Sequence, residues 1–182
     1  MRITGGKLGG RAFQFPTGLS VRPTTDFARQ ALFNILVHRF SLEDANCLDL
    51  FSGSGAISFE LVSRGASAVC CVDANMKCIE AIKKNAVNFK LNVLTVVKSD
   101  AISFIRNHHS TYDFIFADPP YAYPGLPELP DLILQSALLR KDGLLVLEHG
   151  TGTVFHGHSG LIETRQYGEV HFSFFAPDKF GF

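Results

Sequence analysis

The stretch Tyr112-Asp113-Phe114-Ile115-Phe116-Ala117-Asp118-Pro119-Pro120-Tyr121 contains the pattern around which the chain is organised. Its first six residues have the length and composition of a buried strand. The two prolines cannot donate to a sheet ladder, and their fixed φ stiffens the turn that follows. The turn therefore holds a carboxylate, backbone carbonyls and an aromatic ring at the carboxyl end of a strand, where ligands bind in open α/β sheets. Such acceptors beside a flat ring suit a planar group with N–H donors, such as a nucleobase amine. A plain strand-to-helix turn is the alternative.

Strands and helices alternate from residue 46 to residue 148 around this stretch. The predicted further strands are 47–51, 68–72, 94–97 and 143–148. The predicted helices are 56–63, 75–90, one that begins near 101, and 129–139. Residues 161–165 and 170–176 are expected to form a closing antiparallel hairpin. This alternation predicts an α/β fold with a mostly parallel sheet and helices on both faces.

The first forty residues are predicted to be a basic N-terminal extension. A glycine-rich segment, residues 5–10, lies between β-prone stretches and predicts a hairpin or a flexible arm. A helix capped by Thr24 or Thr25 follows, with Asp26 in its first turn. Its expected core face consists of Phe27, Ala28, Ala31, Leu32, Ile35 and Leu36. Arg29 and Phe33 fall off this stripe, so they are expected to face a cleft or to be exposed.

Charge is unevenly distributed along a chain whose net charge is zero. Residues 1–40 contain six lysines and arginines and one acid, Asp26, so this segment carries +5. Such asymmetry indicates contact with a polyanion, and a solvated basic edge is the alternative. Lys7 and Arg11 would supply charge beside a glycine-rich backbone that can lie close to phosphates.

Length and composition indicate one domain, residues 1–182, with no second domain or repeat. The N-terminus lacks the apolar region of a signal peptide, and no apolar run approaches the ~20 residues of a membrane span. The cysteines lack zinc or redox spacing, and His156 and His158 have no acidic or thiol partner nearby in the sequence. We therefore expect a cytoplasmic, monomeric protein without a metal.

The segment Asp49-Leu50-Phe51-Ser52-Gly53-Ser54-Gly55 predicts a glycine turn between a strand and a helix. Ser58 occupies the third glycine position of the dinucleotide fingerprint, and the chain has no Gly-Lys-Ser/Thr of a P-loop. The acid Asp49 before the turn would repel a diphosphate but attract an ammonium group.

Two further acids end the next two predicted strands. Asp73 is placed to accept both hydroxyls of a ribose. Asp100 is placed to accept an adenine amino group, with a backbone N–H from Ala101. Three acids at successive strand ends, a glycine turn and no phosphate cradle favour S-adenosylmethionine (SAM) over NAD or ATP. Each acid alone has the simpler interpretation of a strand end or a helix cap.

Several motifs resemble known methyltransferases. Asp49-x-Phe51-x-Gly53-x-Gly55 resembles motif I of class I SAM-dependent methyltransferases, and Asp118-Pro119-Pro120-Tyr121 resembles their amino-methyltransferase motif IV. The rest of the chain resembles the RsmD-type enzymes in Gly5-Gly6…Gly10-Arg11, Arg22-Pro23-Thr24-Thr25-Asp26, Ala31-Leu32-Phe33-Asn34-Ile35-Leu36, Leu61-Val62-Ser63-Arg64-Gly65-Ala66 and Tyr167-Gly168. The departures are Ser52 for the usual Ala, Asp73 for the commoner Glu, and Phe27 where a basic residue is common.

The resemblance implies a Rossmann-like class I methyltransferase fold and transfer of methyl to the exocyclic N2 of a guanine in small-subunit ribosomal RNA. The implied partner is ribosomal RNA or the small ribosomal subunit. The expected SAM-binding residues are Asp49, Phe51, Gly53, Gly55, Asp73, Asp100, Ala101 and Asp118. The expected catalytic residues are Asp118, Pro119, Pro120 and Tyr121, and the expected RNA-binding residues are Lys7, Arg11, Arg22 and Arg29.

Three other functions are alternatives, and the sequence argues against the last two. A DNA adenine-N6 methyltransferase would use the same motif IV, because it serves any exocyclic amine. An NAD-dependent oxidoreductase would need a phosphate-binding glycine at Ser58 and a hydride-site base, and the sequence shows neither. A non-catalytic RNA-binding protein on this fold would have no need for an intact Asp-Pro-Pro-Tyr.

Overall fold

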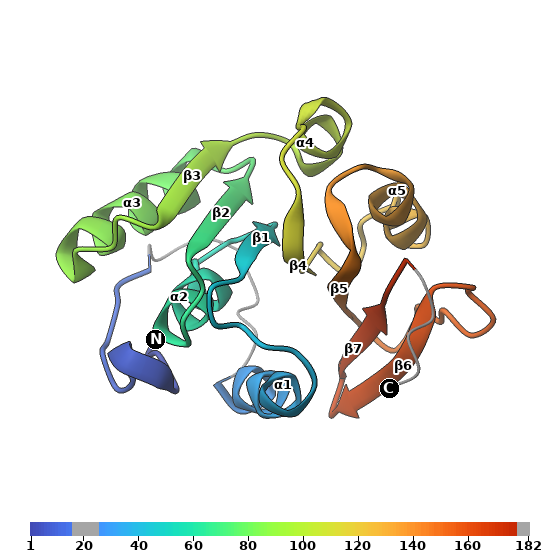
Figure 1. Ribbon diagram of the computed structural model, residues 1–182, viewed down its shortest axis with the longest axis horizontal. Helices are drawn as coiled ribbons and strands as arrows, with labels where there is room; N and C mark the ends of the chain where they lie inside the picture. Colours follow the sequence, from blue (N-terminus) through green and yellow to red (C-terminus); the bar gives the residue numbers. More distant parts are fainter. Residues whose placement is uncertain (16–25, 178–182) are drawn as a thin grey trace.

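A seven-stranded sheet in the order β3-β2-β1-β4-β5-β7-β6 forms the centre of the protein (Figure 1). The structure is a computed structural model, and it describes residues 1–15 and 26–177. The predicted Thr24 or Thr25 cap and the predicted RNA contact Arg22 lie outside these residues. The strands are β1 (Asn46–Leu50), β2 (Ala68–Asp73), β3 (Leu94–Lys98), β4 (Tyr112–Ala117), β5 (Leu139–His149), β6 (Leu161–Tyr167) and β7 (Val170–Phe175). The helices are η1 (Gly6–Leu8), α1 (Asp26–Arg39), α2 (Ala56–Ser63), α3 (Met76–Phe89), α4 (Ala101–Asn107) and α5 (Leu129–Gln135).

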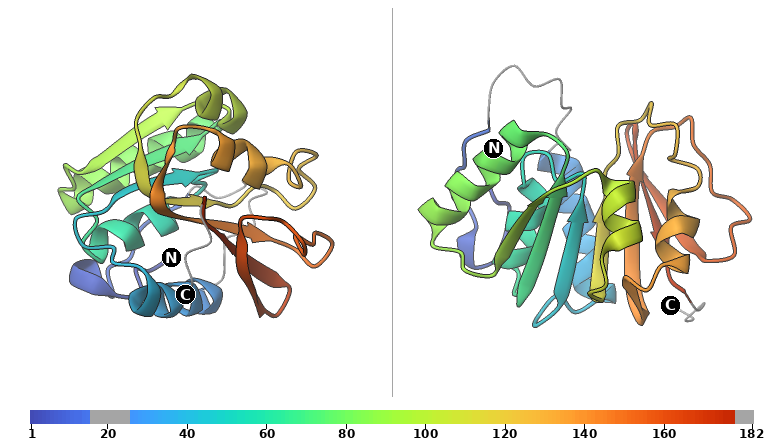
Figure 2. Two further views of the ribbon diagram at one scale, coloured as in Figure 1. Left: turned by 45° about the vertical axis from the view of Figure 1, so that its right-hand side comes forward. Right: turned by 90° about the horizontal axis from the view of Figure 1, so that it is seen from above.

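The sheet is parallel from β3 to β5, and the closing hairpin β6–β7 adds to β5 in the antiparallel sense. Helices α1, α2 and α3 pack on one face and α4 and α5 on the other (Figures 1 and 2). The strand residues alternate between the two cores, as a period of two requires: Cys47 and Phe114 face the first, and Leu48 and Ile115 the second. The predicted α/β fold, with helices on both faces and a closing hairpin, is confirmed.

The predicted end of α5 and the predicted start of β5 were both wrong. The helix ends at Gln135 and not at Leu139, because Ser136 takes an extended conformation with ψ 162°. Leu139 is instead the first residue of β5, where it pairs with Tyr112 at the start of β4. β5 therefore starts before the apolar run from which the strand was predicted. Its residues 140–142 are polar and exposed, so the apolar pattern did not include them.

The core face of α1 is also rotated from the predicted one. Its buried residues are Ala28, Arg29, Leu32, Phe33 and Leu36. Phe27, predicted to be in the core, is 70% exposed, whereas Arg29 and Phe33 are fully buried. The expectation that Arg29 and Phe33 are exposed or face a cleft is therefore wrong. The rotation follows from a buried acid on α2 that faces Arg29.

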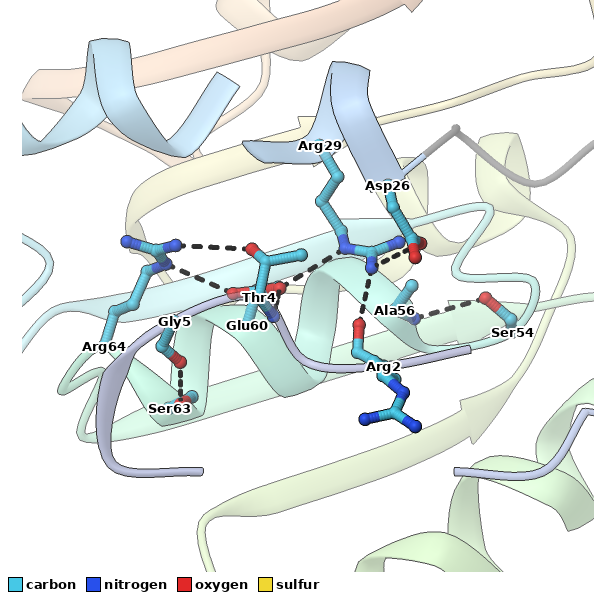
Figure 3. A network of polar contacts seen from close by, with 10 residues as sticks. All are labelled: Arg2, Thr4, Gly5, Asp26, Arg29, Ser54, Ala56, Glu60, Ser63 and Arg64. Atoms are coloured by element: carbon cyan, nitrogen blue, oxygen red, sulfur yellow. Dashed lines mark hydrogen bonds and ion pairs between the residues drawn. The ribbon is translucent and has the colours of Figure 1, made fainter. Parts of the chain in front are cut away.

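That acid, Glu60, is the centre of a polar cluster that connects α1, α2 and the N-terminal segment (Figure 3). Its carboxylate accepts from Arg29 Nε at 3.3 Å, from Arg64 Nε at 3.2 Å and from the backbone N–H of Thr4. The Arg29 Nη2 also donates to Asp26 Oδ1 at 2.8 Å and to the backbone oxygen of Arg2 at 2.6 Å. Arg29 and Glu60 are both 0% exposed, so this ion pair is fully desolvated.

The N-terminal segment, residues 1–15, is docked on the domain and is called the arm below. An antiparallel bridge joins Arg2 to Ala12, which agrees with the predicted hairpin. Ile3 and Phe13 are buried, and Leu8 N–H donates to Ser63 Oγ at 2.9 Å. Gly6 has φ +72°, and a Cβ there would lie 2.0 Å from the backbone oxygen of Ser63. The glycine thus lets the arm approach α2 closely.

The four cysteines are free thiols inside the protein: Cys47, Cys70, Cys71 and Cys78. Burial raises the pKa of Cys47 to about 12 and that of Cys78 to about 11. Burial also raises the pKa of Cys70 and of Cys71. Within residues 1–15 and 26–177, no helix combines the length and apolar character that a membrane crossing requires.

Candidate active site

The strand register brings three strand ends to the same level. Leu50 at the end of β1 pairs with Val72 on β2 and with Ala117 on β4. The next residues, Phe51, Asp73 and Asp118, therefore leave the sheet side by side. The order of the strands reverses at β1, where β2 lies on one side and β4 on the other. Such a switch point is where open α/β sheets bind ligands.

The glycine loop after β1 has a backbone that other residues adopt poorly. Gly53 has φ 51° and Gly55, which caps α2, has φ 76°. A Cβ on Gly55 would lie 2.9 Å from Ile82 Cγ1 and 3.1 Å from Phe59 Cε2. Both conformation and space therefore require glycine at position 55.

Asp73 connects this loop to the end of β2. Its Oδ2 accepts from the Gly53 N–H at 2.7 Å, and its Oδ1 accepts from the Asn75 N–H at 2.7 Å. Each carboxylate oxygen has a second lone pair, so further hydroxyl donors can bind. The structure therefore places Asp73 beside the glycine loop, as the prediction of a ribose site requires.

Asp49 is buried, at 1% exposure. It was predicted to attract the ammonium group of a ligand, but it does not face the open site. Its Oδ2 accepts a short hydrogen bond from the hydroxyl of Ser58 on α2. Burial raises the pKa of Asp49 to about 7, against the lowering effect of the Ser58 hydrogen bonds. The carboxyl group therefore holds the loop and α2 together. In the sequence, Ser58 stood out only because it replaces the third glycine of the dinucleotide fingerprint. Its pairing with Asp49 was not predicted.

Asp100 and Ala101 lie where β3 leads into α4. Asp100 is exposed and caps this helix, accepting from the Ser103 N–H at 3.0 Å, while Ala101 is buried. Tyr123, which sequence reasoning did not single out, connects this corner to the glycine loop. Its ring meets that of Phe51 edge-on, with centroids 5.5 Å apart. Burial and the nearby charge of Asp100 raise the pKa of Tyr123.

The Asp118-Pro119-Pro120-Tyr121 turn begins directly beside the glycine loop. The Asp118 N–H donates to the Leu50 oxygen at 3.3 Å, which continues the pairing of β4 with β1 into the site. The Tyr123 N–H donates to the Pro120 oxygen at 2.7 Å and closes the turn. Pro119 is buried, whereas Pro120 is exposed.

Tyr121 is 38% exposed at the edge of this turn. Its ring lies against Gly150, which follows β5, because a Cβ on Gly150 would come 2.8 Å from Tyr121 Cδ2. Gly150 therefore sets the position of the ring, and sequence reasoning had no signal for it. One edge of the site thus combines a carboxylate, a rigid turn and a partly exposed aromatic ring.

The predicted RNA-binding residues separate into three groups. Lys7 and Arg11 are exposed on the arm. Arg22 lies outside the described residues. Arg29 is 0% exposed and held by Glu60 and Asp26, so its predicted contact with RNA is wrong: the helix buries it in an ion pair. In the part of the chain that the structure describes, no cluster of three or more His, Cys, Asp or Glu side chains is arranged to hold a metal ion.

Comparisons with known proteins agree with this geometry. The family described as "Conserved hypothetical protein 95" matches residues 1–176. The chain is 34% identical over 148 residues to ribosomal RNA small subunit methyltransferase D of Escherichia coli K12, covering 81% of this chain and 74% of that protein. It is 34% identical over 153 residues to the putative rRNA methyltransferase YlbH of Bacillus subtilis, covering 82% of each. The solved structure of the putative methyltransferase yhhF from Escherichia coli matches with a TM-score of 0.83 at 31% identity, covering 96% of each chain.

Proposed function

We propose a function for this chain from its family, since it belongs to the Conserved hypothetical protein 95 family of RsmD-type methyltransferases. The proposed activity is methylation of the exocyclic N2 amine of a guanine in small-subunit ribosomal RNA. The methyl donor is SAM. The observation that carries this proposal is the pairing of β1 with β4, because it sets the glycine loop beside the Asp118 turn.

The residues at the strand ends fit SAM. Asp73 retains lone pairs for the ribose hydroxyls, and Asp100 has one carboxylate oxygen outside its helix cap for an adenine amine. The loop from Phe51 to Gly55 presents backbone to the ligand, and Asp118 borders it. When bound, SAM supplies an electrophilic methyl group on a sulfonium. Asp49 contributes indirectly, by holding the loop on α2.

The Asp118 turn would orient the base. A guanine N2 amine is a poor nucleophile because its lone pair is delocalised into the ring. Asp118 and the Pro119 carbonyl would accept its two N–H groups and direct the lone pair at the methyl group, while Tyr121 stacks on the base and fixes its plane. Transfer would form the new N–C bond as the S–C bond of the donor breaks, and the methylated amine would release its extra proton to solvent water. Orientation and electrostatics supply the acceleration, and no covalent enzyme intermediate is needed. The target base must leave any stack to reach this edge.

The test is methyl transfer from labelled SAM to small ribosomal subunits that lack the modification, followed by mapping of the labelled nucleotide. The Asp118→Ala variant should lose transfer by about 10²–10³-fold, the cost of removing one oriented polar contact to a reacting group. Its affinity for SAM should stay close to that of the wild type. A matched control is Asp131→Ala, because Asp131 is an exposed acid on α5.

The competing function is methylation of the N6 amine of adenine in DNA, since the same turn would hold that amine. Parallel assays with duplex DNA and with ribosomal subunits separate the two. Label in DNA alone would refute the RNA assignment, and full activity of Asp118→Ala would refute the assignment of the site.

A further inference from the structure

Helix α3 and the arm together carry a strong excess of positive charge. Residues 1–15 and 76–90 contain seven lysines and arginines and one acid, Glu80, so they carry +6 in a chain of zero net charge. All of these side chains are exposed: Arg2, Lys7, Arg11, Lys77, Glu80, Lys83, Lys84 and Lys90. The predicted RNA-binding residues included Lys7 and Arg11 of the arm but no residue of α3.

The end of the arm runs beside α3 (Figures 1 and 2) and is bonded to it. Asn85, 4% exposed, accepts from the Gln14 N–H at 3.4 Å and donates to the Gln14 oxygen at 2.7 Å. Nearer the end of the helix, the Arg11 guanidinium lies 4.8 Å from the centre of the Phe89 ring. These contacts fix the arm to α3 at Asn85 and at Phe89.

A groove of about 330 Å³ runs between the arm and α3. Phe15 lines it from the arm, and Lys77, Glu80 and Lys84 line it from the helix. Lys77 and Lys84 are seven residues apart, so they lie on the same side of α3, about 10 Å from each other along its axis. Within the described ranges, none of the ion pairs includes a lysine of α3.

The groove begins at the edge of the candidate active site. Lys77 lies in the first turn of α3, and its N–H donates to the capping side chain of Asn75. Asn75 in turn donates to Asp73, which holds the glycine loop. A polymer bound along the groove would therefore pass directly beside the loop at which the cofactor is proposed to bind.

We infer that the groove between the arm and α3 binds the phosphate backbone of the RNA substrate, with Lys77 and Lys84 as its cations. This inference rests on the proposed function and adds to it the route by which RNA leaves the site. Binding of a single-stranded backbone requires exposed cations along a groove, and Lys77 and Lys84 supply two that form no ion pair among the described residues. Phe15 adds an aromatic ring on which a base could stack.

The experiment uses the full-length chain and compares wild type with Lys77→Gln/Lys84→Gln. A matched control is Arg106→Gln/Lys141→Gln, which removes two exposed cations from elsewhere on the protein, on α4 and at the start of β5. Affinity for a single-stranded ribosomal RNA fragment is measured between 0.05 and 0.4 M salt, alongside affinity for SAM.

Each phosphate contact on single-stranded RNA contributes about 0.7 to the slope of log K against log salt, or about fivefold in affinity at 0.1 M salt. The groove variant should therefore bind RNA about 25-fold more weakly than wild type at 0.1 M, with a slope smaller by about 1.4. Its affinity for SAM should be unchanged, and the control should bind RNA as the wild type does.

Three results would overturn the inference in distinguishable ways. If wild type methylates RNA and the groove variant binds RNA with unchanged affinity and slope, the groove is refuted and the proposed function stands. If the control loses as much affinity as the groove variant, the effect is one of general charge and the groove is also refuted. If wild type binds and methylates no RNA at all, both the groove and the proposed function fail.

Discussion

Replacing Arg29 by methionine tests whether the buried cluster around Glu60 holds the arm and α1 on α2. The substitution removes the fully buried cation from the Glu60 carboxylate, which is 0% exposed and keeps only the more exposed Arg64, and it removes the donor to the Arg2 oxygen. Breaking a fully buried ion pair from one side costs about 3–5 kcal/mol. In a domain of this size each kcal/mol lowers the melting temperature by about 2–4 °C, so we expect a fall of roughly 6–20 °C.

Thermal and urea denaturation followed by circular dichroism measure this loss. The control is Arg165→Met, which breaks an exposed pair with Glu163 and should change the melting temperature little. The double variant Arg29→Met/Glu60→Leu should be more stable than Arg29→Met alone, because the fully buried carboxylate that Arg29 neutralised is then absent as well, and Arg64, which also pairs with it, is partly exposed. A melting temperature of Arg29→Met equal to that of the control would refute this account of the cluster.

Three further predictions concern the candidate site. Burial holds the native pKa of Asp49 at about 7, above its ordinary 3.8, so the native state keeps a proton that the unfolded chain has released. Stability from this group is therefore lost as the pH rises from about 4 to about 7, by up to about 1.4 kcal/mol per unit. Urea titrations of Asp49→Asn across this range should show a shallower fall than wild type, and equal slopes would contradict the assignment. Gly150→Ala would force the Tyr121 ring to move, so kcat/KM for RNA should fall about tenfold. The control Gly152→Ala should act as wild type, because no atom lies within 4 Å of its new methyl group. Gly55→Ala should lower the free energy of unfolding by at least about 1 kcal/mol in urea denaturation, because φ there is +76°; a stability equal to wild type would show that the loop relaxes.

The sheet and most helix limits could be predicted from the sequence because they depend on local patterns. Alternation of apolar residues, the glycine turn and the proline pair each determine their own segment. The order of the strands then brings together loops that are far apart in the chain. The positions of Asp73 and Asp118 beside the glycine loop follow from that order and from the end of each strand.

The errors arose where a distant partner decides the position of a side chain. Arg29 has the charge of a surface residue, and only the buried Glu60 of α2 draws it inward at the expense of Phe27. Asp49 was expected to face a ligand, but Ser58 holds it in the core. Gly150 gives no local signal, because its role depends on Tyr121, 29 positions earlier in the chain.

The burial of every native thiol makes this protein convenient to label. All four cysteines of the chain are buried, and the pKa of each is raised, so they are present almost entirely as unreactive thiols at neutral pH. A single cysteine added at an exposed position would accept a fluorophore or spin label without removal of the native ones. Lys98 at the end of β3, outside the groove, offers such a position for watching ligands arrive at the site.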